Sequence, residues 1–171
     1  FVLEGSDAEA ILDRICANDV AVPVGHVVYT QWLNDRGGIE ADLTVTRESE
    51  TRFLIVTSAA SSTRDLAWLQ RHIPSDARAV AFDATSSYAV LGLMGPRSRE
   101  LLSQLTDTDV SNDAFPFATS QVIDLAYARV RASRITYVGE LGWELYIPTE
   151  FAQGVFDAIA ASDPDAAAEA M

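Results

Sequence analysis

Two pairs of residues in this sequence could do chemistry together, and each pair joins a tyrosine to a carboxylate: Tyr29 with Asp42, and Tyr137 with Glu144. A buried carboxylate needs a partner, and a heterocycle edge with two adjacent N–H donors would satisfy it through two hydrogen bonds, as an arginine does. The tyrosines could offer a flat face or an O–H donor. The alternative is that the tyrosines pack in the core and the acids face solvent, which is commoner for both residue types.

The first pair lies on a predicted β-hairpin. Residues 26–33 are rich in β-branched and aromatic side chains, and residues 39–46 alternate between apolar and polar side chains, which is the period of a half-buried strand. Two consecutive glycines between these runs supply the positive φ of a hairpin turn. Asp42 and Thr44 share the polar face with Glu40. Because acids are depleted in strands, this face either lines a pocket or faces solvent.

The second pair lies on a run that glycines interrupt. Tyr137 precedes Gly139 and Gly142, and Glu144 follows them near the start of an apolar strand. Glycines break a strand and permit a ligand to approach the backbone closely. This run is therefore a candidate ligand contact, although an acid after a glycine turn is usually solvated.

Other chemical signals are weak in the sequence. The two histidines, His26 and His72, match no metal-ligand spacing, and no metal is expected. The glycines at 92 and 95 lack the three-glycine spacing of a dinucleotide fingerprint. Cys16 falls on an apolar helical face, which favours a buried structural thiol over a nucleophile.

The composition is that of one ordinary globular domain of 171 residues, with 49% apolar and 22% charged residues. The formal net charge is −13 and all twelve basic residues are arginine, so nucleic acid is not an expected partner. A single cysteine fits a reducing compartment, here taken as the cytoplasm, and no apolar run is long enough to span a membrane. Because the sequence begins and ends abruptly, we expect it to be part of a longer protein.

Four helices are expected, with strands between them. Ser6 and Glu9 have the spacing of a capping box for the first helix. Ser61 or Ser62 is expected to cap the second, and Pro96 to stand in the first turn of the third. The alanine-rich C-terminal tail is expected to be helical or frayed. The residues of the last helix expected to face the core are Phe151, Val155, Phe156 and Ile159. Besides the hairpin, strands are expected at residues 1–3, 52–57, 79–83, 87–93, 120–125, 128–135 and 143–147.

The two halves of the chain repeat one another at an offset of 90 residues. The identical pairs are Gly5 with Gly95, Leu12 with Leu102, Asp19 with Asp109 and Val20 with Val110. Chance matches are the alternative. The repeat predicts an α+β fold, a duplicated antiparallel sheet-plus-helix unit, with halves of about 1–85 and 86–171 forming one domain over residues 1–171.

Four blocks of sequence resemble the folate-binding domain of the glycine-cleavage T-protein (aminomethyltransferase) family. In order they read GGIEADLTVTR, FLIVTSAASSTRDLAWL, LGLMGPRSRELLSQL and YVGELGWELYIPTEFA. The first and last look closest to the folate domains of dimethylglycine oxidase and of dimethylglycine and sarcosine dehydrogenases. The resemblance covers almost the whole chain and implies this family's fold. The family's C-terminal barrel would fall beyond Met171, and a site built from these residues alone would be open on one side.

The resemblance also implies roles for individual residues. Asp42 stands at the family's essential aspartate, a base or electrostatic partner at the folate amine that attacks the one-carbon unit. Tyr29 and Tyr137 fall at positions that touch the folate, and Glu144 falls at the glutamate that grips the pterin ring. Ala41 stands where glycine-cleavage members often have a second aspartate. The expected folate-binding residues are Tyr29, Thr44, Ser58, Tyr137 and Glu144, with Ser58 in place of a common asparagine.

The activity implied is tetrahydrofolate-dependent one-carbon transfer. A methylated amine is oxidised elsewhere to an iminium, and tetrahydrofolate captures the methylene group to give 5,10-methylenetetrahydrofolate. The expected partners are the folate, the amine, and either an FAD-binding domain ahead in the same chain or a lipoyl carrier protein. The alternatives are a glycine-cleavage aminomethyltransferase and a folate-binding scaffold without catalysis. The pocket is expected to join Asp42 of the first half to Glu144 of the second.

Overall fold

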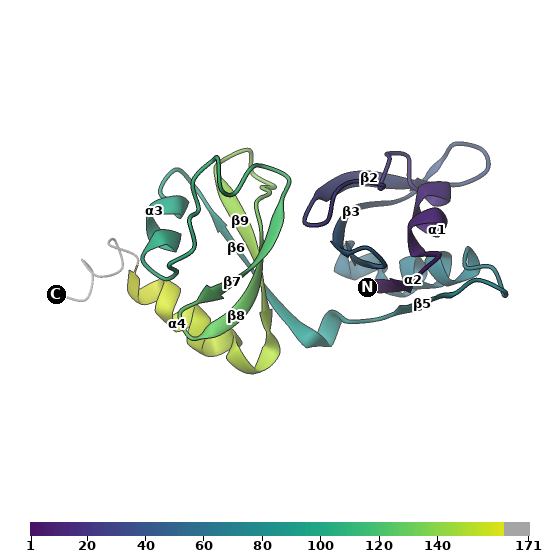
Figure 1. Ribbon diagram of the computed structural model, residues 1–171. Coiled ribbons are helices and arrows are strands. Elements are labelled where there is room, and N and C mark those ends of the chain that lie inside the picture. Colours follow the sequence, from purple (N-terminus) through teal and green to yellow (C-terminus); the bar gives the residue numbers. More distant parts are fainter. Residues whose placement is uncertain (163–171) are drawn as a thin grey trace. The chain divides into compact units, whose positions relative to one another are not determined.

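The computed structural model describes residues 1–162, which fall into two compact units (Figure 1). Unit 1 is Phe1–Thr85, and unit 2 begins at Ser86. The structure expected for the alanine-rich tail lies outside the described residues. Within the described part of the chain, every helix is too short or too polar to cross a membrane.

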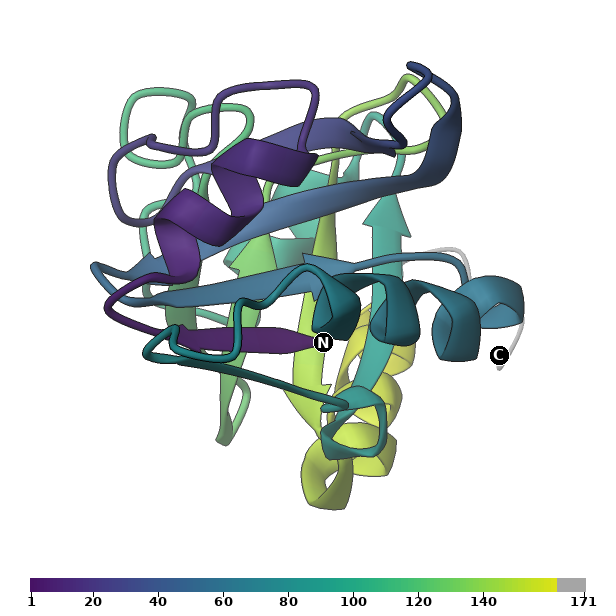
Figure 2. The same cartoon turned by 90° about the vertical axis from the view of Figure 1, so that its right-hand side faces the viewer.

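Unit 1 is a five-stranded antiparallel sheet with the strand order β2-β3-β4-β1-β5. Both of its α-helices cover the same face of this sheet (Figure 2), where Leu12, Leu69 and Phe53 belong to one buried apolar cluster. In chain order the elements are β1 (Val2–Gly5), α1 (Ala8–Ile15), β2 (Val27–Leu33), β3 (Ile39–Ser49), β4 (Arg52–Val56), a 3-10 turn (Ala59–Ser61), α2 (Ser62–Arg71) and β5 (Ala79–Phe82).

Unit 2 is a four-stranded antiparallel sheet with the order β6-β9-β8-β7. Its two α-helices also share one face, where Leu102, Val155 and Trp143 belong to a second buried cluster. After a 3-10 turn (Thr85–Ser87) the elements are β6 (Tyr88–Met94), α3 (Ser98–Ser103), β7 (Ser120–Leu125), β8 (Ala128–Ser133), β9 (Gly142–Pro148), a second 3-10 turn (Thr149–Phe151) and α4 (Ala152–Ser162).

The two units have the same topology. If β1 to β4 are matched in chain order with β6 to β9, both sheets place their strands in one order, β2-β3-β4-β1 in unit 1 and β7-β8-β9-β6 in unit 2. A helix follows the first strand in each unit and another follows the fourth. The fold is therefore α+β and consists of a duplicated antiparallel sheet-plus-helix unit, as the sequence repeat predicts.

A half-buried arginine occupies the corresponding place in each unit. The guanidinium of Arg47 lies 5.5 Å from the ring centroid of Phe53 and donates to the carbonyl of Val22 at 2.9 Å. The guanidinium of Arg134 lies 5.7 Å from a ring centroid of Trp143 and donates to the carbonyl of Phe115 at 2.6 Å. Each arginine thus joins a loop to the aromatic residue that anchors its core.

The capping box predicted at Ser6 and Glu9 is wrong. Helix α1 begins at Ala8 and its N-cap residue, Asp7, makes no side-chain capping bond. The Glu9 carboxylate instead pairs with the Arg47 guanidinium at 2.7 Å. The carboxylate that a capping box would use is therefore engaged by an arginine of β3.

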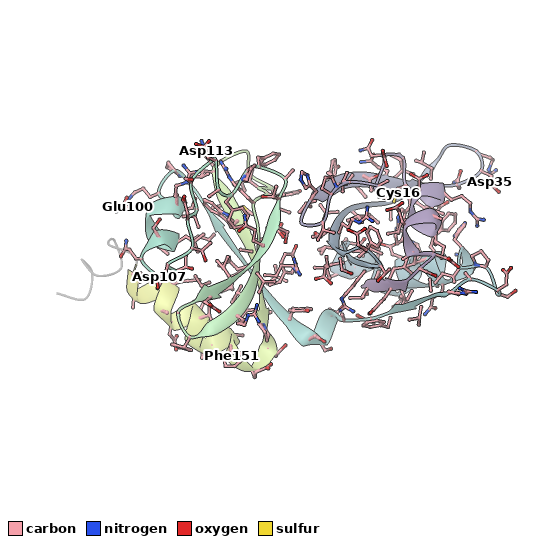
Figure 3. All side chains as sticks on the ribbon, in the orientation of Figure 1. Cys16, Asp35, Glu100, Asp107, Asp113 and Phe151 are labelled. Atoms are coloured by element: carbon pink, nitrogen blue, oxygen red, sulfur yellow. The ribbon has the colours of Figure 1, made fainter. Side chains whose placement is uncertain are left out.

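Two further helix predictions need correction. Helix α3 begins at Ser98, so Pro96 precedes the helix. In α4 only Val155 is fully buried, with Ile159 packed at the edge of the cluster, whereas Phe151 and Phe156 are 39% and 52% exposed (Figure 3 labels Phe151). Phe151 lies in the 3-10 turn ahead of the helix, and Phe156 is one residue, about 100°, around the helix from Val155.

Candidate functional site

The hairpin of unit 1 presents four polar side chains on the sheet face away from the helices. Strands β2 and β3 pair so that Gln31 lies opposite Asp42 and Tyr29 lies opposite Thr44. The intervening residues of β3, such as Leu43, are buried in the core, so the side chains of this set point to the other face. The alternation predicted for this strand is confirmed for residues 41–45. Thr46, expected on the polar face, is 3% exposed, and Ile39 is 68% exposed beyond an irregularity in the pairing.

Asp42 is exposed and both of its carboxylate oxygens accept hydrogen bonds from β2. The Tyr29 hydroxyl donates to Oδ2 at 2.8 Å, and the Gln31 side-chain amide donates to Oδ1 at 2.9 Å. Two donors from one neighbouring strand fix the orientation of the carboxylate while solvent, or a ligand, can still reach it. The sequence analysis paired Tyr29 with Asp42 but missed Gln31. Gln31 lies two residues after Tyr29 and therefore on the same face of the strand, which is the signal that could have identified it.

The other two expected residues of unit 1 lie near this cluster in the sheet order. Thr44 is half-buried between Tyr29 on β2 and Val56 on β4. Ser58 is exposed two residues beyond the end of β4. Its carbonyl accepts bonds from the backbone N–H and hydroxyl of Ser61, at 3.1 and 3.2 Å. The backbone around Ser58 is thus held by the turn that leads into α2.

A buried carboxylate that the sequence did not reveal stabilises this turn. Asp65 is 1% exposed. Its Oδ2 accepts bonds from the hydroxyls of Thr57 at 2.6 Å and Ser61 at 2.7 Å, and its Oδ1 pairs with Arg64 at 2.9 Å. Arg64 also donates to the carbonyl of Glu40 at 2.6 Å. Because Glu40 precedes Asp42 by two residues on β3, this network links the start of α2 to the strand that carries Asp42.

In unit 2, Glu144 lies on the sheet face away from the helices. Its neighbours across the sheet are Gly92 on β6 and Ser133 on β8. The Tyr146 hydroxyl donates to Glu144 Oε2 at 2.5 Å. Burial, followed by the negative charge of Glu144 and this hydrogen bond, raises the pKa of the Tyr146 phenol, so the phenol stays protonated and remains a donor at neutral pH.

Tyr137 lies apart from this hydrogen bond. It is 93% exposed and stands in the loop between β8 and β9, ahead of Gly139, which has a φ of 77°. Asp42 belongs to unit 1, whereas Tyr137 and Glu144 belong to unit 2. That these side chains line one cavity stays a prediction.

Cys16 has the properties of a structural thiol. It is half-buried at the end of α1 (Figure 3), and burial raises the pKa of its thiol to about 11, which keeps it protonated and weakly nucleophilic at neutral pH. Among residues 1–162, no three or more His, Cys, Asp or Glu side chains are grouped in a way that could hold a metal ion.

Comparisons with known proteins identify relatives over nearly the whole chain. The family model described as the GCVT N-terminal domain matches residues 1–170. A 4-methylaminobutanoate oxidase (formaldehyde-forming) of Paenarthrobacter nicotinovorans is 39% identical over 159 residues, which are 93% of this chain and 19% of that protein. The mitochondrial pyruvate dehydrogenase phosphatase regulatory subunit of Mus musculus is 34% identical over 91% of this chain and 18% of its own length.

The mitochondrial dimethylglycine dehydrogenase of Rattus norvegicus is 36% identical over 93% of this chain and 19% of its own length. The chain therefore spans about a fifth of the length of these three relatives. Among solved structures, the glycine cleavage system aminomethyltransferase T from Bartonella henselae matches 96% of this chain and 43% of its own, with a TM-score of 0.76 and 24% identity, which is a likeness of fold. On the full-length family match and these identities, the chain belongs to the GCVT N-terminal domain family.

Proposed function

We propose that this domain binds a reduced folate and transfers to it a one-carbon unit from a methylated amine. The observation that carries the proposal is the Asp42 carboxylate, which is exposed while Tyr29 and Gln31 fix both of its oxygens. A solvated surface acid has no need of two donors from the neighbouring strand. A reacting group has that need, because its geometry must be set before the ligand arrives.

Each unit holds a carboxylate whose chemistry suits one part of a reduced folate. The aminopyrimidine edge carries two adjacent N–H donors, and a carboxylate such as Glu144 accepts both. The reacting amines of a reduced folate are basic nitrogens that must lose a proton, and a carboxylate such as Asp42 accepts it. The further folate contacts that we propose are Tyr29, Thr44 and Ser58 in unit 1 and Tyr137 in unit 2.

Asp42 has one task in the reaction, which is to take up a proton. Bound tetrahydrofolate supplies the nucleophilic nitrogen, so that an iminium and tetrahydrofolate give 5,10-methylenetetrahydrofolate, the demethylated amine and one proton. Two carbon–nitrogen bonds to the folate form and the carbon–nitrogen bond to the amine breaks. One of the two folate N–H protons leaves with the amine, and Asp42 accepts the other, which solvent then removes from the exposed carboxylate. The hydrogen bonds from Tyr29 and Gln31 keep the accepting oxygen in place during the step.

The names of two relatives suggest the class of amine. One is an oxidase of 4-methylaminobutanoate that forms formaldehyde, and another is a dimethylglycine dehydrogenase. Both names describe the loss of hydrogen or carbon from an N-methylated amino acid. We therefore propose an N-methyl amino acid as the source of the iminium, with an FAD-dependent domain of the same protein as its producer; a lipoyl carrier protein would take this place in a glycine-cleavage enzyme.

The Asp42→Asn variant tests the proposal. It keeps the size of the side chain and loses the proton acceptor, so the rate of methylene transfer to tetrahydrofolate from an iminium of formaldehyde and a secondary amine should fall about 10²- to 10⁴-fold. The affinity for 5-formyltetrahydrofolate, measured by titration calorimetry, should stay within about threefold. The matched control is Asp35→Asn, an exposed acid in the hairpin loop (Figure 3). Wild-type transfer by the D42N protein would refute the role of Asp42, and absence of saturable folate binding by the wild type would refute the whole proposal.

A second candidate function is a folate-binding or regulatory module without catalysis. The relative named as a phosphatase regulatory subunit favours it, because that name describes no one-carbon chemistry. The two candidates differ in one measurement. A scaffold would bind 5-formyltetrahydrofolate with the same affinity and would show no transfer above the uncatalysed rate, whatever residue occupies position 42.

A further inference from the structure

The surroundings of Glu144 are asymmetric. On one side, Ser133 lies opposite it on β8 and donates to the hydroxyl of Ser120 at 3.0 Å, with both serines buried. On the other side, Gly92 lies opposite it on β6 and is exposed. A flat molecule that approaches Glu144 therefore meets bare backbone on the β6 side, whereas on the β8 side the serine hydroxyls are buried and bonded to each other.

The fold itself does not require a glycine at position 92. A Cβ there would meet only the flexible end of Met94, at 3.4 Å from Cε and 3.9 Å from Sδ. The glycine φ values in the positive region belong to other positions, such as Gly95 and Gly139. Glycine weakens a strand, so the stability of β6 does not explain its presence. The open surface that it leaves beside Glu144 does.

Tyr146 has the opposite character. It stands two residues after Glu144 on the same strand and face, is 4% exposed, and has its hydroxyl 2.5 Å from Oε2. Arg131 lies opposite Tyr146 on β8. A carboxylate has about four lone-pair sites, so the bond from Tyr146 fixes Glu144 without exhausting its capacity to accept further N–H donors.

We propose that Tyr146 is a positioning residue, which holds Glu144 in the orientation that recognises the ligand. We also propose that the bare backbone at Gly92, here called the floor of the site, is the surface against which a planar ring with two adjacent N–H donors packs. The inference rests on the proposed function and adds two residues to its site. The aminopyrimidine edge of a reduced pteridine is the ligand chemistry that fits. Tyr146 acts through Glu144, whereas Gly92 acts by the absence of a side chain.

A double-mutant cycle separates positioning from a general structural role. Tyr146→Phe should weaken the binding of 5-formyltetrahydrofolate about 3- to 10-fold, the effect of one lost hydrogen bond. In the Glu144→Ala background the same change should have no further effect, because the group through which Tyr146 acts is gone. Tyr127→Phe, at an exposed tyrosine between β7 and β8, is the matched control and should bind as the wild type does. Thermal unfolding of each variant verifies that it is folded.

The Gly92→Val variant separates a loss of ligand affinity from a loss of stability. Valine favours the strand, so the midpoint of thermal unfolding should hold or rise while the affinity for 5-formyltetrahydrofolate falls at least about tenfold, since the side chain occupies the floor. Val80→Leu, at an exposed strand position of unit 1, is the control and should change the affinity by less than about threefold.

The outcomes distinguish this inference from the function on which it rests. If the wild type does not bind 5-formyltetrahydrofolate, the proposed function fails. If the wild type binds and the G92V protein binds equally well, the floor is refuted. If Y146F weakens binding by the same factor with and without Glu144, positioning is refuted while the proposed function stands.

Discussion

At the scale of single residues, the orientation of the Asp42 carboxylate depends on two donors from the neighbouring strand, Tyr29 and Gln31. The alternation of residues 39–46 was enough to place Asp42 on the polar face of a strand and to associate it with Tyr29. Gln31 was missed because a glutamine on a strand has no chemistry of its own, and its importance comes from lying opposite Asp42 in the pairing. The partner of a reacting group is thus a property of strand register, which the sequence specifies only indirectly.

The role of Gln31 can be measured apart from stability. Gln31→Leu removes the donor to Asp42 Oδ1, so the rate of methylene transfer should fall about 3- to 30-fold. Because Asp42 is exposed, the free energy of unfolding should change by less than about 0.5 kcal/mol in urea titrations. Gln70→Leu, at an exposed position of α2, should change neither quantity. A Q31L protein with wild-type transfer would show that Tyr29 alone is sufficient to orient Asp42.

Cys16 leads to a prediction about pH. Burial raises the pKa of this thiol to about 11, so the folded protein binds a proton that the unfolded chain, with a thiol pKa of about 8.5, releases earlier. Alkylation of Cys16 by iodoacetamide at pH 8 should be on the order of 100-fold slower in the folded protein than in urea. Stability should fall as the pH rises from about 8.5 toward about 11, and this part of the fall should be absent from Cys16→Ala. Equal alkylation rates in the folded and unfolded states would contradict the pKa assignment.

At the scale of elements, apolar periodicity predicted the strands well and predicted the helix ends poorly. Strands β4, β7 and β9 lie within a residue of the ranges read from the sequence. The start of α1 was misjudged because Ser6 and Glu9 satisfy a local capping pattern, and the pairing of Glu9 with Arg47 depends on a residue 38 positions away. Local patterns cannot anticipate a long-range ion pair.

The network at the start of α2 makes a prediction about stability. Asp65→Ala removes a buried acceptor and leaves the hydroxyls of Thr57 and Ser61 without it, so the free energy of unfolding should fall by about 2–4 kcal/mol. The comparison is Asp13→Ala on the exposed face of α1, which should cost less than about 0.5 kcal/mol. Urea titrations of the two variants decide the matter. A D65A protein as stable as D13A would mean that the network contributes no net stability.

At the scale of the whole molecule, the repeat of 90 residues was the most informative feature of the sequence. It predicted two units of one topology, and the strand orders of the two sheets agree. The identities that revealed it lie between the end of the first strand and the loop after the first helix of each half, because the later strands carry different side chains on the same backbone. A repeat in sequence specifies the topology of each unit, whereas the packing of one unit against another depends on surface side chains that do not repeat.

The repeat also allows two equivalent glycines to be compared. Gly5 and Gly95 have φ values of 145° and 131°, where side chains are disfavoured. A Cβ on Gly5 would overlap the carbonyl oxygen of Arg78, whereas a Cβ on Gly95 would meet nothing within 4 Å. Gly95→Ala should therefore cost about 1–2 kcal/mol from backbone strain alone, and Gly5→Ala should cost at least about 3 kcal/mol. Equal losses in urea titrations of the two variants would show that the overlap relaxes without cost.

The stacked arginines have a consequence for the internal motions of each unit. The backbone of Arg47 exchanges hydrogen bonds with Gly25 and His26, and the backbone of Arg134 does so with Ala118 and Thr119. The same two residues clamp a loop carbonyl and an aromatic ring through their guanidinium groups. Opening of either loop breaks its bond to the guanidinium, the same group that packs on the aromatic ring, so we expect loop opening and loosening of the ring contact to be coupled. A lysine at either place could keep the charge but would uncouple the two motions.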